Sequence, residues 1–155
     1  MELADILSEE SVLVCTDISS KPDLLSRLAA KVSALTGHAE ADVFAALSDR
    51  EALGSTGLGN GIAVPHGKIA GLKGVVAAFI KLTSPVDFEA VDDQPVDLVM
   101  MLLAPVGAGA DHLKALARVA RVLRTDAVVD RLRRTTDPAK LHAILTQPLE
   151  VTRAA

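Results

Sequence analysis

Residues 50–68 read REALGSTGLGNGIAVPHGK, and the interpretation of the whole chain starts from this stretch. It opens as the end of a helix, continues as a glycine-rich loop and a short apolar run, and places His66 between Pro65 and Gly67. Its five glycines expose backbone amides and let an anion approach closely. Pro65 stiffens the backbone on one side of His66, and Gly67 leaves the other side open. The stretch therefore predicts an anion site centred on His66.

The chemistry available to His66 is that of a nucleophile. A neutral imidazole has one nitrogen lone pair free to attack phosphorus, while the other ring nitrogen needs an acceptor that fixes the tautomer. Arg50 and the loop are in place to hold phosphoryl oxygens through charged and backbone donors. From the loop we expect the following phosphoryl-binding residues: Ser55, Thr56, Gly57 and Gly59.

Three familiar motifs are excluded by spacing. A P-loop needs four residues between its first glycine and Gly-Lys, whereas five separate Gly61 from Gly67-Lys68, and Ile69 follows where Ser or Thr is needed. The glycines of residues 57–61 do not have the dinucleotide-binding spacing. A nucleophile elbow around Ser55 would need glycine two residues earlier, where the chain has leucine.

Composition narrows the class of protein further. The chain has 155 residues, half of them hydrophobic, with three Phe, no Trp, no Tyr and a net charge of −4. These values argue against nucleic-acid binding, which needs a basic surface and aromatic stacking. Cys15, the single cysteine, excludes an internal disulfide and a cysteine-based zinc site, and we interpret it as buried filler. The amino terminus lacks the pattern of a signal peptide, and no apolar run is long enough to span a bilayer, so a cytoplasmic protein is expected.

Periodicity predicts the elements of the fold. We expect a helical turn near residues 3–7, helices near 20–37, 39–53, 112–124, 127–134 and 138–145, and strands near 11–15, 62–64, 75–82 and 96–103. Residues 54–61 and 83–95 are expected to be irregular. The result is an α/β protein with one domain over residues 1–155, in which a mixed sheet is flanked by helices on both faces.

The helix ends carry their own signals. Ser20 and Asp23 predict a capping box, Gly37 and Gly54 predict left-handed caps, and Asp111 predicts an N-cap. In the helix that follows Asp111 we expect a core-facing apolar stripe made of Leu113, Leu116, Ala120 and Leu123. An apolar rim for a protein partner is expected around His66, with these candidates: Leu58, Ile62 and Ile69.

Residues 50–68 closely resemble the active-site segment of enzyme IIA proteins of the bacterial phosphotransferase system. The agreement is with the fructose/mannitol type, and within it the chain is most similar to the nitrogen-related branch. FEAVDDQPVDL at residues 88–98 and DHLKAL at residues 111–116 also resemble this family. The resemblance extends from about residue 3 to residue 145.

The resemblance implies a phosphotransferase component that carries a phosphoryl group on His66. The donor would be an HPr-like phosphocarrier, His112 would lie beside His66, and Arg50 would assist transfer. Because both partners in the exchange are activated phosphoamidates, no metal or other cofactor is expected. At the start of its helix, His112 is expected to be a neutral donor, since the helix dipole disfavours its protonation.

Alternatives stay open at this point. Arg50 can cap its own helix, His112 can bond a loop carbonyl, and Ser55 and Thr56 can shape a turn. Nitrogen-branch resemblance implies regulation of protein targets, such as sensor kinases or potassium transporters, without membrane insertion. The rival is a sugar-transport enzyme IIA that passes the phosphoryl group to a fructose- or mannitol-type IIB domain.

Overall fold

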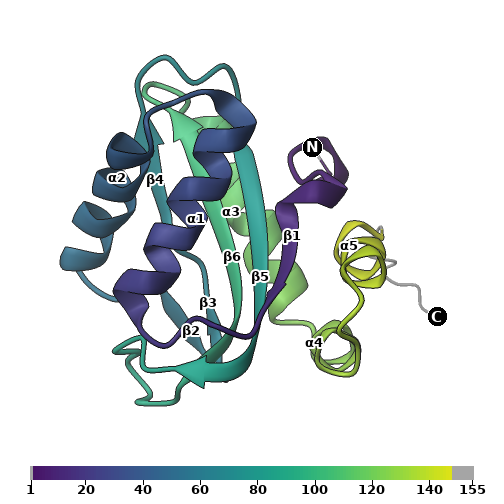
Figure 1. The fold of residues 1–155 in the computed structure, drawn as a ribbon. Helices are drawn as coiled ribbons and strands as arrows, with labels where there is room; N and C mark the ends of the chain where they lie inside the picture. The colour runs from purple at the N-terminus through teal and green to yellow at the C-terminus, as the bar shows by residue number, and fades with distance from the viewer. Residues whose placement is uncertain (1, 148–155) are drawn as a thin grey trace.

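The computed structural model describes residues 2–147 and builds them around one mixed β-sheet (Figure 1). Within those residues the sheet has six strands in the order β1-β5-β6-β3-β2, and β4 also pairs with β6. The strands are β1 (Val12–Cys15), β2 (Gly57–Gly59), β3 (Ile62–Ala63), β4 (His66–Ile69), β5 (Val76–Val86) and β6 (Val96–Pro105). The central pair β5–β6 is antiparallel, whereas β1 is parallel to β5 and both β3 and β4 are parallel to β6.

Helices cover both faces of this sheet, which confirms the expected fold class. One face carries α1 (Lys21–Thr36) and α2 (Glu40–Ala52). The other carries α3 (Ala110–Leu123), α4 (Asp126–Arg133), α5 (Pro138–Thr146) and the 3-10 turn η1 (Leu3–Asp5), while η2 (Glu9–Ser11) leads into β1. Figure 1 shows the two groups on opposite sides of the strands. None of the helices in residues 2–147 is long and apolar enough to cross a bilayer.

The central strands are buried on both faces, so their sequences are apolar almost throughout. In β5, Ala78 and Ile80 pack with α1 and α2, whereas Ala77 and Phe79 pack with the helices on the other side. All four are fully buried. This period-two division, repeated in β6, separates the molecule into two cores with the sheet between them.

Of the four predicted helix caps, those at Ser20 and Gly37 are present, and those at Gly54 and Asp111 are wrong. The Ser20 hydroxyl accepts from the Asp23 N–H at 3.2 Å. The Asp23 carboxylate accepts from the N–H of Ser19 at 3.4 Å, and not from that of Ser20 as the capping box requires. Gly37 ends α1 with φ of 80°, as expected. At the end of α2 the prediction was wrong: Leu53 closes the helix in a right-handed conformation, and Gly54 has φ of 146°, outside the left-handed helical region.

The loops predicted around the sheet contain more strand than expected. Residues 57–59, expected to be irregular, form β2 and pair with β3, and β5 continues past residue 82 to Val86 after a register shift. Pro85 is tolerated there because β1 ends at Cys15, opposite Leu82, and leaves that side of β5 unpaired. His66 itself lies on a strand, β4, that the sequence did not predict.

Helix α3 is rotated relative to the predicted apolar stripe. Its N-cap is Gly109, so Asp111 lies within the first turn and the predicted Asp111 cap is wrong. The buried face consists of His112, Ala115, Val119, Val122 and Leu123. Of the stripe expected to face the core, Leu113 is 66% exposed, and Leu116 and Ala120 are only partly buried. Leu123 is buried as expected, so the helix leaves Leu113 exposed and holds Leu116 and Ala120 at the border of the core.

Lys81 connects the sheet to α4 through a buried ammonium group. Its Nζ atom donates to the carbonyl oxygens of Leu132 at 2.9 Å, Arg133 at 3.0 Å and Thr135 at 2.6 Å. These carbonyls lie at and just beyond the end of α4, where a helix lacks its own donors. Burial lowers the pKa of Lys81, and the three acceptors and the nearby charge of Asp97 compensate in part for the lost hydration of its charge.

Replacing Lys81 by methionine should destabilise the fold. Lys81→Met keeps most of the side-chain volume but leaves three carbonyls without a donor, so we expect the free energy of unfolding to fall by about 2 kcal/mol. Urea unfolding followed by circular dichroism measures this loss. Lys73→Met, at an exposed lysine, is the control and should have little effect. Equal stability of the two variants would contradict the role given to Lys81.

Candidate active site

His66 owes its position to an interruption along one edge of β6. Strands β3 and β4 pair with that edge in succession, and Val64 and Pro65 separate them. Proline has no N–H to donate, but the Pro65 carbonyl still accepts from the Leu102 N–H at 3.0 Å. The Val64 carbonyl is left free of the ladder and becomes available to a side chain.

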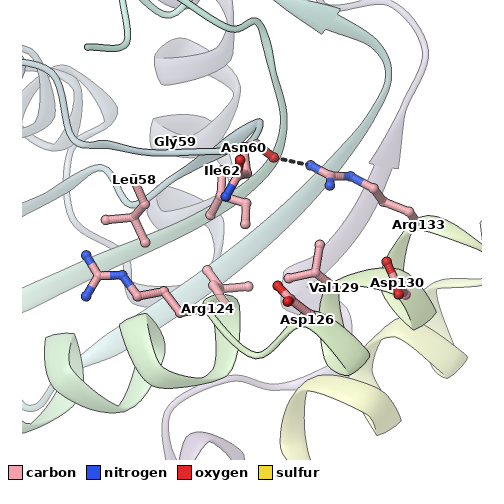
Figure 2. Close-up of a pocket in the computed structure, with 10 residues that line it drawn as sticks. Leu58, Gly59, Asn60, Ile62, Arg124, Asp126, Val129, Asp130 and Arg133 are labelled. Atoms are coloured by element: carbon pink, nitrogen blue, oxygen red, sulfur yellow. Dashed lines mark hydrogen bonds between the residues drawn. The ribbon is translucent and has the colours of Figure 1, made fainter. Parts of the chain in front are cut away.

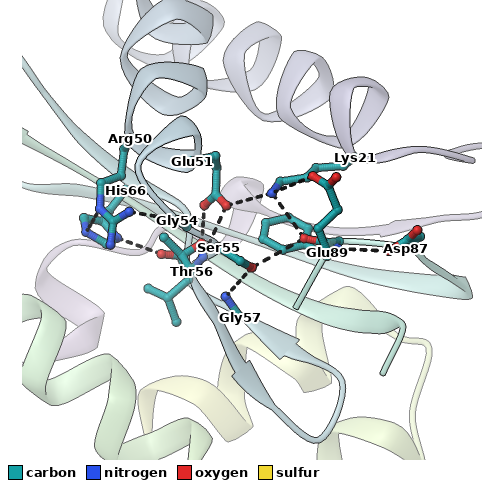
Figure 3. Close-up of polar contacts among 12 residues, drawn as sticks. Lys21, Arg50, Glu51, Gly54, Ser55, Thr56, Gly57, His66, Asp87 and Glu89 are labelled. Atoms are coloured by element: carbon teal, nitrogen blue, oxygen red, sulfur yellow. Dashed lines mark hydrogen bonds and ion pairs between the residues drawn. The ribbon is translucent and has the colours of Figure 1, made fainter. Parts of the chain in front are cut away.

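The His66 ring uses that free carbonyl. Its Nδ1 atom lies 2.8 Å from the Val64 oxygen, and because a carbonyl only accepts, Nδ1 carries the proton. Nε2 therefore has the lone pair, and it accepts a hydrogen bond from Arg50 Nε at 3.3 Å (Figure 3). The tautomer-fixing acceptor that the chemistry required is thus a main-chain oxygen two residues earlier.

Arg50 reaches His66 from the last turn of α2. Its Nη1 atom donates to the Gly54 carbonyl at 2.9 Å while Nε faces the imidazole, so the guanidinium is held at two points. Arg50 therefore bonds a main-chain carbonyl just after the end of α2 and at the same time places a permanent cation beside Nε2 of His66.

His112 lies in the first turn of α3 and is 7% exposed. The centroid of its ring is 5.6 Å from that of His66, at an interplanar angle of 49°. Burial lowers the pKa of His112, and the neighbouring charges of His66 and Lys68 lower it further, so the ring is neutral near pH 7. The expected neutral state agrees with this direction, although burial and not the helix dipole is the leading cause.

The second nitrogen of His112 helps define its tautomer. Nδ1 is buried and has no hydrogen-bond partner within residues 2–147. A ring N–H at that position would have no acceptor, which favours placing the proton on Nε2. A neutral His112 can then donate a hydrogen bond from Nε2 without adding charge to the site.

Ser55 and Thr56 are both close to His66, but their hydroxyl groups are already engaged. Ser55 Oγ accepts from the Gly57 N–H at 3.1 Å and donates to the Phe88 carbonyl at 3.4 Å. The Thr56 hydroxyl and N–H both donate to the buried carboxylate of Glu51. These contacts correspond to the turn-shaping role that the sequence left open.

The two glycines of the loop lie on different surfaces. Gly57 lines the hollow beside His66, and a Cβ atom there would lie 2.9 Å from Ala90 Cβ, so the close packing requires glycine. Gly59 lines a separate hollow of about 460 Å³ between the β2–β3 turn and α4, shown in Figure 2. In that hollow Arg133 donates to the Asn60 carbonyl at 2.6 Å. Gly59 is therefore not brought to His66.

Two hollows flank His66 and share Arg50 and Leu116 as walls. One, of about 280 Å³, extends over Thr56, Gly57 and Ala120, and the other, of about 450 Å³, extends over His112 and Leu53. A phosphoryl group on Nε2 would lie where they meet, in reach of Arg50. Within residues 2–147 no cluster of three or more His, Cys, Asp or Glu side chains is placed to bind a metal ion.

The apolar rim has different members from those expected. Ile62 and Ile69 are buried, at 4% and 8% exposure, because both belong to the sheet, and only Leu58 remains partly accessible. In their place Leu53, at 83% exposure, and the partly buried Leu116 line the hollows beside His66. We define the apolar rim as Leu53, Leu58 and Leu116.

The sequence did not single out two parts of the site. The Val64 carbonyl is invisible to residue-type reasoning, because any residue at that position has one. Glu51 had a signal, since it follows Arg50 directly in the stretch that carries the family resemblance, but its burial could not be foreseen.

Comparisons with known proteins identify the family of the chain. A family model described as "Phosphoenolpyruvate-dependent sugar phosphotransferase system, EIIA 2" matches residues 5–147. A nitrogen regulatory protein of Bradyrhizobium diazoefficiens is 47% identical over 148 residues, which cover 96% of this chain and 97% of that protein. The chain therefore belongs to the type-2 enzyme IIA family of the phosphotransferase system.

Solved structures give the same result. The crystal structure of the nitrogen regulatory protein IIA-Ntr from Neisseria meningitidis has a TM-score of 0.87 and 36% sequence identity, covering 93% of this chain and 99% of that one. A mannitol enzyme IIA from Escherichia coli, solved in complex with phosphorylated enzyme IIB, has a TM-score of 0.74 and 23% identity over 90% of this chain and 98% of that one. The second likeness concerns the fold alone.

The lowered pKa of His112 predicts a pH-dependent contribution to stability. The unfolded chain binds this proton near the ordinary value of 6.5, whereas the folded protein resists it, so acidification through that value should favour unfolding. Thermal unfolding of wild type and His112→Phe, measured between about pH 7.5 and pH 5, tests this. The variant should lose less stability on acidification, and parallel curves for the two proteins would contradict the prediction.

Proposed function

We propose that this protein accepts a phosphoryl group on Nε2 of His66 from an HPr-like phosphohistidine protein and regulates target proteins through its phosphorylation state. The observation that carries the proposal is the pair of contacts on His66. The Nδ1–H group donates a hydrogen bond to the Val64 carbonyl, and Nε2 is left unprotonated beside Arg50 and the two hollows. A histidine held in this way is a prepared nucleophile.

The transfer step needs positioning and charge stabilisation more than bond-making by the protein. The Nε2 lone pair forms a bond to phosphorus as the bond between phosphorus and the donor's nitrogen breaks, and that electron pair returns to the donor's imidazole. Positive charge that develops on His66 is spread toward Nδ1–H and stabilised by the Val64 oxygen, 2.8 Å away. Arg50 and neutral His112 supply donors to the phosphoryl oxygens.

The apolar rim gives this site a surface that proteins can cover. Leu53, which directly follows α2, is 83% exposed and lines one hollow beside His66, and apolar exposure around a reactive group is typical of a contact surface. Phosphorylation adds about −1.5 to −2 charges at its centre. A target that buries the rim well should then bind the unphosphorylated form in preference, because the charge must lose its hydration to be covered.

Regulation of the nitrogen branch is the role that the relatives' names favour. The Bradyrhizobium protein, at 47% identity, and the Neisseria structure, at 36%, both carry the description nitrogen regulatory protein. By this analogy the targets are regulatory proteins, and the family resemblance implies sensor kinases and potassium transporters as the target classes. The transport alternative has sugar-specific enzyme IIB as the next acceptor.

A labelling experiment tests the phosphosite. Incubation with phosphoenolpyruvate, enzyme I and an HPr-like protein should place one acid-labile phosphoryl group on the wild-type chain. His66→Ala should abolish labelling, because it removes Nε2, the proposed nucleophile. His38→Ala, distant from the site, is the control and should be labelled normally. Undiminished labelling of His66→Ala would overturn the assignment.

The labelled protein also separates the two destinations. On addition of a fructose- or mannitol-type IIB domain, the regulatory function predicts that the phosphoryl group stays on the chain. Rapid passage to IIB, and from there to a sugar, would establish the transport alternative instead.

The apolar rim predicts the effect of a charge at the docking surface. Leu53→Glu should lower the kcat/KM of phosphoryl transfer from the HPr-like donor by about tenfold, equivalent to ~1.4 kcal/mol, since a carboxylate would have to be buried without a partner. Val91→Glu is the matched control, because Val91 is 89% exposed but lines neither hollow beside His66. Equal rates for both variants would argue against docking at the rim.

A further inference from the structure

A buried ion pair lies behind the site without touching His66. The side chains of Lys21 and Glu51 are 12% and 4% exposed, and Lys21 Nζ is 3.0 Å from Glu51 Oε1. The ammonium group also donates to the Phe88 carbonyl at 3.1 Å and lies 4.3 Å from the centroid of the Phe88 ring. Burying two charges has a high desolvation cost, and replacing such a pair by apolar side chains is often neutral or stabilising. Fold stability alone therefore does not account for it.

The carboxylate of Glu51 holds the chain that leads to His66. Its Oε1 atom accepts from the Thr56 N–H at 3.2 Å, and its Oε2 atom accepts from the Thr56 hydroxyl (Figure 3). The Thr56 carbonyl in turn accepts from the Val64 N–H at 3.1 Å. The Val64 carbonyl in turn accepts the hydrogen bond that His66 Nδ1–H donates. One series of hydrogen bonds thus connects the buried pair to the atom that selects the tautomer.

A second connection reaches the other ring nitrogen. Arg50 and Glu51 are neighbours in the last turn of α2, and Arg50 is held by the Gly54 carbonyl, two residues before Thr56. The Glu51 carboxylate therefore fixes the Thr56 end of the short segment between these two residues. The Gly54 carbonyl in the same segment orients Arg50 toward Nε2 of His66. Displacing this segment would affect both nitrogens of His66 together.

We propose that Glu51, neutralised by Lys21, is a positioning residue of the phosphoryl-transfer site, which sets the His66 tautomer through Thr56 and Val64. The inference rests on the proposed function for its kinetic consequence but not for its structural one. Lys21 lies 3.0 Å from the carboxylate as its counter-ion, and the two carboxylate oxygens accept from both donors of Thr56 at once. A small displacement of a reacting group is enough to slow transfer substantially.

A pair of neutral double variants tests this without leaving an isolated buried charge. Lys21→Met/Glu51→Leu removes the acceptors of Thr56, and Lys21→Met/Glu51→Gln keeps one acceptor of nearly the same shape. Three quantities are measured on each: the nitrogen-15 chemical shifts of the His66 ring, the rate of phosphoryl transfer from the HPr-like donor, and the free energy of unfolding. Lys81→Met is the control for a buried lysine whose loss destabilises the fold away from His66.

The Leu variant should show a mixture of His66 tautomers and a kcat about 100-fold below wild type, with the KM for the donor protein little changed. The Gln variant should lie between it and wild type. Lys81→Met should lose stability while its His66 shifts and kcat stay at wild-type values. The proposal is overturned if both double variants match wild type in shifts and kcat, whatever their stability.

Two further outcomes are informative. If the Leu variant does not fold, Glu51→Asp takes its place, because the shorter carboxylate remains beside Lys21 but is drawn away from Thr56. The same tautomer mixture is then expected, and wild-type shifts would again overturn the proposal. If wild-type protein is not phosphorylated at all, the proposed function fails, but the nitrogen shifts still decide whether Glu51 sets the tautomer.

Discussion

The arrangement of the site depends on how one edge of β6 is shared. Two short strands, β3 and β4, pair with it in turn, and the proline between them interrupts the ladder for a single step. A buried backbone carbonyl needs a donor, and at this step the donor is the imidazole of His66. A requirement of sheet formation thereby fixes which nitrogen of His66 carries the proton. The strand along which His66 lies is fully buried from Leu98 to Ala104.

Helix α3 serves the site on two sides at once. Its inner face packs into the core and carries His112, whose ring is buried and therefore neutral. On its outer side Leu116 lines both hollows around His66. A helix with apolar residues on a face wider than its core contact has surface left for a partner. The neutral ring of His112 and part of the apolar rim are consequently held by the same element.

The cationic side chains that make specific contacts inside the molecule lie in different places: Lys81 away from His66, and Lys21 and Arg50 near it. Lys81 secures α4 to the sheet by three carbonyl contacts on the face away from α1 and α2. Lys21 neutralises Glu51 on the opposite face, next to the loop of the site. The guanidinium of Arg50 donates to Nε2 of His66. Each charge is buried only where specific acceptors meet it, as the cost of desolvation demands.

Much of this protein was determined by local sequence. The apolar runs and cap signals were sufficient for five helices, the central strands and the mixed sheet covered on both faces, because helix and strand periods are written in neighbouring residues. Glycines around a Pro-His-Gly sequence were likewise sufficient to identify His66, with Arg50 and His112 added by the family resemblance. Tertiary structure alone decided the rest. Strand β4 forms because β6 has a free edge, α3 buries the side that carries His112 and leaves Leu113 of the predicted stripe exposed, and Ile62 and Ile69 leave the rim for the sheet. The Val64 carbonyl bonds a side chain only two residues away, but a main-chain oxygen is common to all residue types and so gives no sequence signal. The burial of Glu51 depends on Lys21, which belongs to another helix, so no local pattern could have shown it.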